Sequence, residues 1–225
     1  MTNYFYVAPE QMIKDRAEFA QKGIARGRSI VAAIYDVGVL MVAENPSASL
    51  NKISEIYDRM AFAGVGKYNE FDRLREAGIR WADGTGFTYA REDVDARALA
   101  NYYAQHVGDM FTEGSKPLEI EILVAQLGGP LRPTKLYRIA YEGTISDEPR
   151  FAVLGGDAET IKSRFAASED HPMPLAATLH NAVAALAGPE RTIPVSDLEV
   201  AVLEDRGSRR TFHRLTDDEV GELLR

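Results

Sequence analysis

Residues 28–66 read RSIVAAIYDVGVLMVAENPSASLNKISEIYDRMAFAGVG, and this stretch decides the fold. It contains two pairs of apolar segments. Residues 29–35 and 39–43 flank the turn Asp36-Val37-Gly38, and residues 53–57 and 60–63 flank Asp58-Arg59. Segments of this kind predict strands buried on both faces, or the inner sheet of a layered sandwich. A polar loop that contains Lys52 joins the two pairs.

The composition is that of an ordinary globular protein. The 225 residues are 45% hydrophobic and 27% charged, which is enough for one sizeable core. The net charge of −8 argues against nucleic acid as the main partner. The sequence has no cysteine, so disulfides, thiol nucleophiles and thiolate metal sites are excluded.

Neither a membrane span nor a secretory signal is predicted. No apolar run approaches the roughly 20 residues that cross a bilayer, and the first residues lack a basic region followed by a long apolar one. We therefore expect no membrane partner and a cytoplasmic location. Residues 1–8 are uncharged and contain the adjacent aromatics Tyr4, Phe5 and Tyr6. Such a segment either folds back on its own domain, or packs against copies of itself and plugs an opening.

The remaining elements follow from periodicity, caps and turns. Pro9 suits the first turn of a helix that extends to Lys22. Further helices are predicted at 67–77, 94–112, 158–167, 174–186 and 217–225, further strands at 118–127, 136–141, 151–154, 198–203 and 210–214, and a glycine-containing turn at 82–86. His106 is expected to pack on the apolar face of the second of these helices. Strands grouped together, with helices in pairs, predict an α+β fold. We expect a four-layer αββα sandwich with an N-terminal helix added to it, as a single domain over residues 9–225.

No motif commits the chain to chemistry. The four histidines show no paired metal-ligand spacing, and there is neither a Gly-x-Ser-x-Gly elbow nor a Walker-type loop. No metal or cofactor is expected. One chemistry does suit an αββα sandwich, in which an N-terminal Thr, Ser or Cys uses its own α-amino group as base. Arg28 occupies the position that this nucleophile needs. Ser29 remains as an alternative nucleophile, provided that self-cleavage removes residues 1–28.

Many short stretches together resemble proteasome α-type subunits, and most closely those of actinobacteria. The matching stretches are 9–11, 18–20, 22–26, 38–40, 42–47, 49–55, 57–59, 66–72, 111–113, 136–139, 147–149 and 198–203. They span nearly the whole chain, so the resemblance is more specific than any single motif.

The resemblance implies the αββα fold of N-terminal-nucleophile hydrolases and assembly into seven-membered rings. Two α rings cap two inner rings of β subunits, which carry the threonine proteolytic sites, whereas α subunits are catalytically silent. In this family the N-terminal tail forms a pore gate, which maps onto Met1, Thr2, Asn3, Tyr4, Phe5, Tyr6, Val7 and Ala8. The Tyr-Asp-Arg motif of archaeal and eukaryotic α tails is absent there.

The resemblance also assigns a docking site. Lys52 matches the lysine that receives the C-terminal carboxylate of a ring-shaped activator, and Glu18 and Gly66 align with other positions of that pocket. In actinobacteria the implied partners are an AAA-type ATPase and unfolded substrates tagged with a small ubiquitin-like protein. Two alternatives stay open. In the first, Lys52 is an ordinary solvated lysine. In the second, the chain is a scaffold of the same fold without a protease partner.

Overall fold

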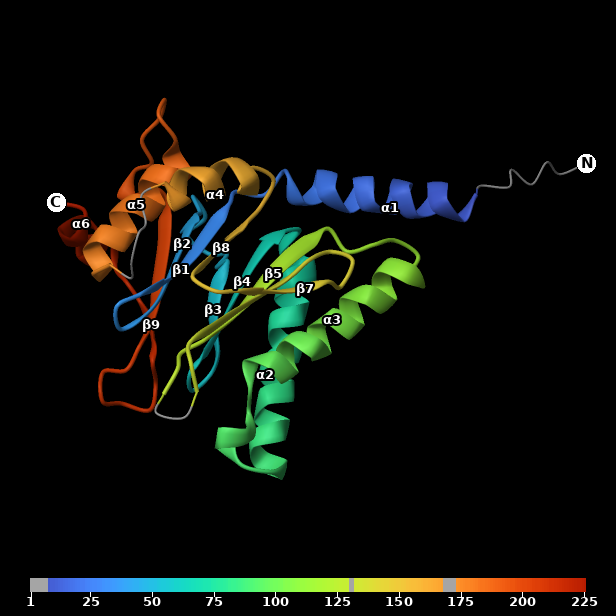
Figure 1. Cartoon of the computed structure of the whole chain (residues 1–225), viewed down its shortest axis with the longest axis horizontal. Coiled ribbons are helices and arrows are strands. Elements are labelled where there is room, and N and C mark those ends of the chain that lie inside the picture. Colours follow the sequence, from blue (N-terminus) through green and yellow to red (C-terminus); the bar gives the residue numbers. More distant parts are fainter. Residues whose placement is uncertain (1–7, 130–131, 168–172) are drawn as a thin grey trace, which may run out of the picture.

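A computed structural model describes residues 8–129, 132–167 and 173–225. Two antiparallel sheets of five strands lie face to face, with strand orders β10-β9-β2-β1-β8 and β3-β4-β5-β6-β7. Helices cover both outer faces (Figure 1). The predicted four-layer α+β sandwich with an N-terminal helix is therefore confirmed.

The described elements follow the predicted order closely. They are α1 (Pro9–Ile24), β1 (Ile30–Tyr35), β2 (Gly38–Glu44), β3 (Ile53–Tyr57), β4 (Met60–Gly66), α2 (Tyr68–Thr88), the 3₁₀-helix η1 (Arg91–Asp93), α3 (Ala96–Thr112), β5 (Ile120–Gln126), β6 (Lys135–Ile139), β7 (Ile145–Glu148), β8 (Phe151–Leu154), α4 (Ala158–Ala166), α5 (Leu175–Ala187), the 3₁₀-helix η2 (Val195–Asp197), β9 (Leu198–Glu204), β10 (Phe212–Arg214) and α6 (Asp217–Leu223).

The two hairpins predicted in residues 28–66 are present, one in each sheet. In the first, Ile30 pairs with Ala43, and in the second Ile53 pairs with Ala63. All seven residues of β2 are buried, as expected for a strand covered on both faces. The loop that contains Lys52 therefore crosses from one sheet to the other.

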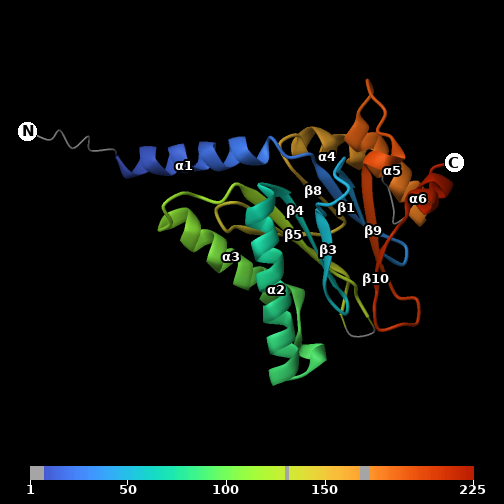
Figure 2. The ribbon, with the colours of Figure 1, turned by 180° about the vertical axis from the view of Figure 1, so that it is seen from behind.

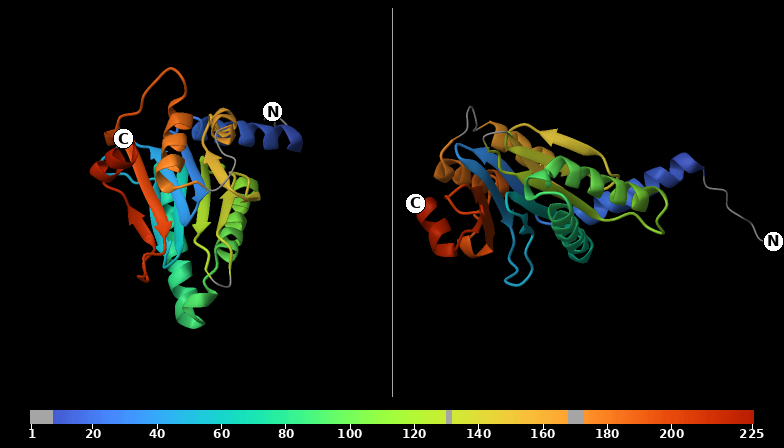
Figure 3. Two further views of the ribbon diagram at one scale, coloured as in Figure 1. Left: turned by 60° about the vertical axis from the view of Figure 1, so that its left-hand side comes forward. Right: turned by 90° about the horizontal axis from the view of Figure 1, so that it is seen from below.

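Three apolar layers hold the sandwich together. Between the sheets lie residues such as Ile30, Met41 and Leu123, all fully buried. Helices α2 and α3 pack on the β3–β7 sheet through a layer that contains Phe62 and Tyr103. Helices α4 and α5 cover the other sheet (Figure 3). Close packing of this kind supplies most of the stabilisation of a domain of this size.

Three local predictions are wrong. The turn expected at 82–86 is the last part of the continuous helix α2, in which Gly86 packs on Tyr57. Strand β7 was not predicted, because its sequence Ile-Ser-Asp-Glu is polar and its residues lie at the edge of a sheet. His106 is exposed rather than packed on the apolar face of α3. Tertiary contacts override local propensity in the first two cases.

The packing of α2 on α3 makes a sharp prediction at Gly78. A Cβ there would lie 1.8 Å from the Tyr103 hydroxyl oxygen. We expect Gly78→Ala to lower the free energy of unfolding by about 1–3 kcal/mol, as overpacked cores do, although alanine is the better helix former. Thermal unfolding of the purified subunit measures this difference.

Gly84 provides the matched control in the same helix. Nothing lies within 4 Å of a Cβ built there. Gly84→Ala should therefore stabilise the protein by up to about 1 kcal/mol through helix propensity alone. If Gly78→Ala also stabilised it, the described contact between α2 and α3 would be wrong.

Candidate functional site

In the loop between β2 and β3, side chains ahead of Lys52 form hydrogen bonds with the backbone of the loop itself. Asn45 Nδ2 donates to Leu50 O at 2.7 Å, and Asn45 Oδ1 accepts from Ser47 N at 3.2 Å. Ser47 Oγ accepts from Leu50 N at 3.1 Å. Asn and Ser side chains that bond to nearby backbone groups stabilise turns of this kind. Lys52 is thus presented from an ordered loop.

The buried carboxylate of Glu199, on β9, fixes the end of this loop. Its oxygens accept from Lys52 N at 2.8 Å, Ile53 N at 3.1 Å and Asn45 Nδ2 at 2.7 Å. They also accept from Arg214 Nη1. A buried carboxylate requires several such donors, because desolvation disfavours its charge. Glu199 thereby joins β9 of one sheet to the first residue of β3 in the other.

The Lys52 ammonium is turned toward two backbone carbonyls. Nζ donates to Arg28 O at 2.8 Å and to Glu44 O at 3.1 Å. Burial lowers the pKa of Lys52 to about 8, against the opposing effect of Glu199 and Glu44. Lys52 is therefore not an ordinary solvated lysine. An ammonium carries three protons, and these two contacts leave one for an incoming acceptor.

The side chain of Glu44, whose backbone carbonyl binds Lys52, is engaged by arginines. Glu44 accepts a bidentate contact from Arg191, with both N–O distances at 2.8 Å, and also pairs with Arg28. The Arg191 contact is the main reason why the pKa of Glu44 lies below its usual range. The charge of Glu44 is thus neutralised mainly by guanidinium groups. Lys52 is left bound to carbonyl oxygens.

A polar groove of about 920 Å³ lies beside this cluster. Its walls are residues 25–29 after α1, one side of α4, and residues 186–191 at the end of α5 and after it, together with Glu44. The groove and the Lys52 loop meet at Arg28, because Arg28 lines the groove and its carbonyl binds Lys52.

Gly66 lies close to the same place. A Cβ on Gly27 would lie 2.9 Å from Gly66 N, so Gly66 packs beside the residue before Arg28. Gly66 has φ of +103°, and a Cβ there would lie 2.0 Å from Glu119 O. Glycine is required here by the backbone and by this close approach. Lys52 therefore contacts Arg28, and Gly66 contacts the residue before it, Gly27.

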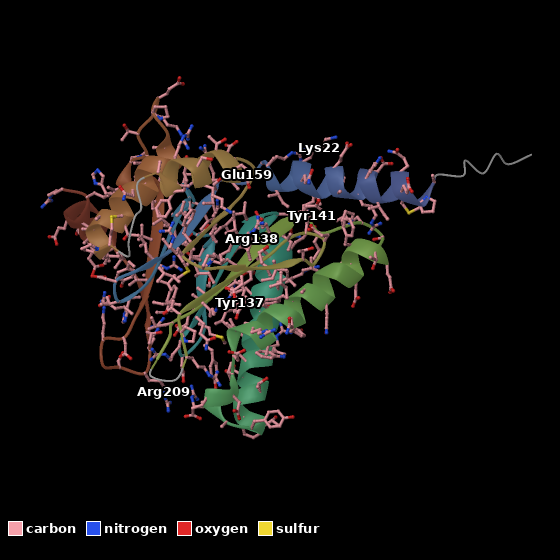
Figure 4. All side chains as sticks on the ribbon, viewed as in Figure 1. Lys22, Tyr137, Arg138, Tyr141, Glu159 and Arg209 are labelled. Atoms are coloured by element: carbon pink, nitrogen blue, oxygen red, sulfur yellow. The ribbon has the colours of Figure 1, made fainter. Side chains whose placement is uncertain are left out.

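Glu18, the third predicted pocket residue, lies apart from them on α1. Its carboxylate is exposed and lies 3.5 Å from Lys22 Nζ. In Figure 4 Lys22 points away from the sheets. Among the described residues no hydrogen bond or ion pair joins Glu18 to Lys52 or Gly66.

The start of β1 does not provide a free N-terminal nucleophile. The strand begins at Ile30, and residues 25–29, which include Arg28 and Ser29, connect it to α1. Ser29 is buried, and a Cβ on Gly155 would lie 2.6 Å from its Oγ. Removing residues 1–28 would also delete Ile24 of α1, which is part of the buried core.

The described residues contain neither a metal-binding cluster nor a membrane-spanning helix. Within residues 8–129, 132–167 and 173–225 no group of three or more acidic, histidine or cysteine side chains could hold a metal ion. None of the described helices is long and apolar enough to span a membrane. Of the predicted gate, Met1–Val7 lie outside the described residues, and Ala8 immediately precedes α1.

Sequence reasoning missed the residues that hold Lys52 in place. Glu199 is a glutamate within the apolar strand sequence Leu-Glu-Val-Ala-Val-Leu, and that pattern was the available signal. Arg191 and Arg214 gave no local signal, because their partners are 147 and 15 residues away in the sequence.

Comparisons with known proteins agree with this architecture. A family described as "Proteasome subunit" matches residues 24–191. "Proteasome subunit alpha" of Acidimicrobium ferrooxidans is 60% identical over 224 residues, covering 100% of this chain and 97% of the relative. The proteins of the same name from Arthrobacter sp. and Sanguibacter keddieii are 50% and 51% identical, covering 100% of this chain and 98% and 90% of their own lengths. The chain therefore belongs to the proteasome subunit family, as a member of its α type.

Proposed function

We propose that this subunit is a non-catalytic part of the outer ring of a proteasome, where it controls the entrance and binds activators. An α-type subunit assembles with β subunits and with further α subunits. The observation that supports the docking role is the Lys52 ammonium, whose hydrogen-bond partners among the described residues are two backbone carbonyls. A cytoplasmic AAA-type ATPase and substrates that carry a small protein tag are the proposed partners.

The Lys52 cluster suits a single carboxylate. One amine proton remains for an acceptor, and a charge-assisted hydrogen bond to an entering C-terminus would satisfy it. Arg26 and Arg28 line the adjacent groove, and Gly66 lies beside Gly27 at the end of that groove. Backbone without a side chain lets a peptide approach closely. Glu18 lies on α1, apart from Lys52. It would contribute to the pocket of a neighbouring subunit, or would contact another part of the activator tail.

The tail is the proposed gate. Residues 1–8 precede a helix that projects beyond the sheets (Figure 2). Aromatic residues at positions 4–6 would bury one another where several tails converge. The alternative, hydrolysis by Ser29, requires loss of a helix that is packed into the core, and nothing in the geometry favours it.

Replacing Lys52 tests the docking site. We expect Lys52→Ala to abolish stimulation of peptide hydrolysis by an activator tail, because the carboxylate loses its cation. A charge-assisted hydrogen bond contributes about 1.5–3 kcal/mol, so binding of the tail should weaken roughly tenfold to a hundredfold. Basal hydrolysis and particle size should be unchanged. Lys135→Ala is the control and should be stimulated normally, because it removes a lysine of β6 that pairs with Asp147 of β7. Stimulation that survives in Lys52→Ala would contradict the docking site.

Docking should weaken at a lower pH than it would with an ordinary lysine. The pKa of Lys52 is lowered to about 8, and a bound carboxylate would raise it again. Affinity for the tail should therefore be full below this pKa and fall about tenfold per pH unit above it. Titration with a free-acid peptide and with its C-terminal amide measures the difference. A free-acid affinity that stays constant up to about pH 10, the range of an ordinary lysine, would show that Lys52 is not the receiving group.

Removing the tail tests the gate. A chain in which Pro9 follows the initiator methionine should assemble with β subunits into a particle with higher basal peptide hydrolysis, because the entrance is no longer covered. Such a particle should gain little from an activator tail. Unchanged basal hydrolysis in a particle of normal size would count against the gate.

A further inference from the structure

Helix α1 is attached to the rest of the fold by only part of its length. Its buried residues, Ala20, Gly23 and Ile24, all lie in the C-terminal half. Met12 and Ile13 in the other half are 52% and 56% exposed. Figures 1 and 2 show the helix extending past the sheets, above the C-terminal end of α3. The direction of its free half therefore depends on a few contacts.

Among the described residues, the hydrogen bonds from α1 to another element that lie farthest toward the N-terminus are those of Arg16. Its Nε donates to Phe111 O at 2.6 Å, and its Nη2 donates to Met110 O at 3.0 Å and Gly114 O at 2.9 Å. The guanidinium also lies 5.9 Å from the centre of the Phe111 ring. These carbonyls belong to the last turn of α3 and the residues after it, which have no partner within the helix. The negative end of the α3 dipole adds to the attraction for a cation there.

Two further contacts continue along the same face of α1. Lys116 Nζ lies 5.6 Å from the centre of the Phe19 ring and is held by Glu70 at 2.6 Å. Gly23 packs against Glu119, so closely that a Cβ would lie 2.4 Å from Glu119 Oε2. Positions 16, 19 and 23 lie on one side of a helix, because they are three and four residues apart. This side faces the connection between α3 and β5.

The three contacts have different consequences for the free end. Gly23 and Phe19 hold the half of α1 that is already next to the sheets. Arg16 alone among them lies at the start of the projecting half, and seven residues, 9–15, extend beyond it to Ala8. At 1.5 Å per residue they form a rigid arm of about 10 Å. A small change of angle at Arg16 therefore moves the point from which the tail starts by several ångströms.

We infer that Arg16 is a positioning residue for the gate: by binding the carbonyl end of α3 it fixes the direction of α1, and so the place where residues 1–8 begin. This inference rests on the proposed gate. It assigns the closed entrance to an intramolecular bond that lies far from the tail itself. Loss of the bond leaves the tail intact but starts it from a variable position, and tails that start from variable positions converge poorly.

The experiment crosses Arg16→Gln with removal of the tail in particles assembled with β subunits. In the full-length chain Arg16→Gln should raise basal peptide hydrolysis toward the level of the tail deletion, with the KM for the peptide unchanged. In the shortened chain the same substitution should have no effect, because no tail remains to be misplaced. A merely structural role would change both backgrounds alike. Lys14→Gln, which removes the same charge from an exposed position of α1, is the matched control and should leave hydrolysis unchanged.

A second measurement follows α1 directly. The chain has no cysteine, so spin labels at Gln11→Cys and Asn101→Cys report one distance between α1 and α3. Arg16→Gln should broaden that distance distribution, and Lys14→Gln should not. If Arg16→Gln prevents assembly, Arg16→Lys decides the matter. A lysine keeps the charge but not the fork of donors, so a smaller rise that again disappears in the shortened chain is expected.

Three results overturn the inference. They are an unbroadened distance in Arg16→Gln, unchanged hydrolysis in an Arg16→Gln particle whose tail deletion does raise it, and a rise that persists in the shortened chain. The gate fails separately, if the tail deletion itself has no effect. The inference then fails with it, even where the distance broadens.

Discussion

The arrangement of the proposed docking site depends on one buried carboxylate, that of Glu199. It binds the backbone at Lys52 and Ile53 and the side chains of Asn45 and Arg214. Arg214 in turn donates to Ile53 O at 2.6 Å, so the contact between β9, β10 and β3 is closed on both sides. Glu199 is buried whereas the Arg214 side chain is 36% exposed, so loss of Arg214 would leave a buried carboxylate with one donor fewer. These contacts fix the position of one sheet relative to the other at the loop that joins β2 to β3.

The pairing of the acidic groups also determines which cation remains available to a partner. Both acidic groups near Lys52 bind arginines, Glu44 to Arg191 and Arg28, and Glu199 to Arg214. The planar fork of Arg191 binds the Glu44 carboxylate bidentately, whereas Arg214 divides its donors between Glu199 and Ile53 O. The single-point ammonium of Lys52 is left with neutral carbonyls, and burial lowers its pKa. A weakly compensated cation beside a polar groove is the electrostatic basis of the proposed carboxylate site.

Local patterns predicted most of the fold and little of the site. The hairpins, the helix starts and the capping box at Thr216 depend on residues a few positions apart, so the sequence shows them directly. Strand β7 and the end of α2 depend on neighbours from other elements, and both were mispredicted. Lys52 and Gly66 were found only through the family resemblance. The bonds that fix the site join residues as far apart as Lys52 and Glu199, separated by 147 positions, and no local pattern reports them.

Helix α1 explains why this sandwich does not present an N-terminal nucleophile. A nucleophile that uses its own α-amino group must stand free at the start of β1. Here that position is enclosed, since Ala20 and Ile24 of α1 lie in the core and Gly155 packs on Ser29. Arg16 ties the same helix to the carbonyl end of α3. The helix that excludes an N-terminal nucleophile is therefore also the one that sets where the proposed gate would begin.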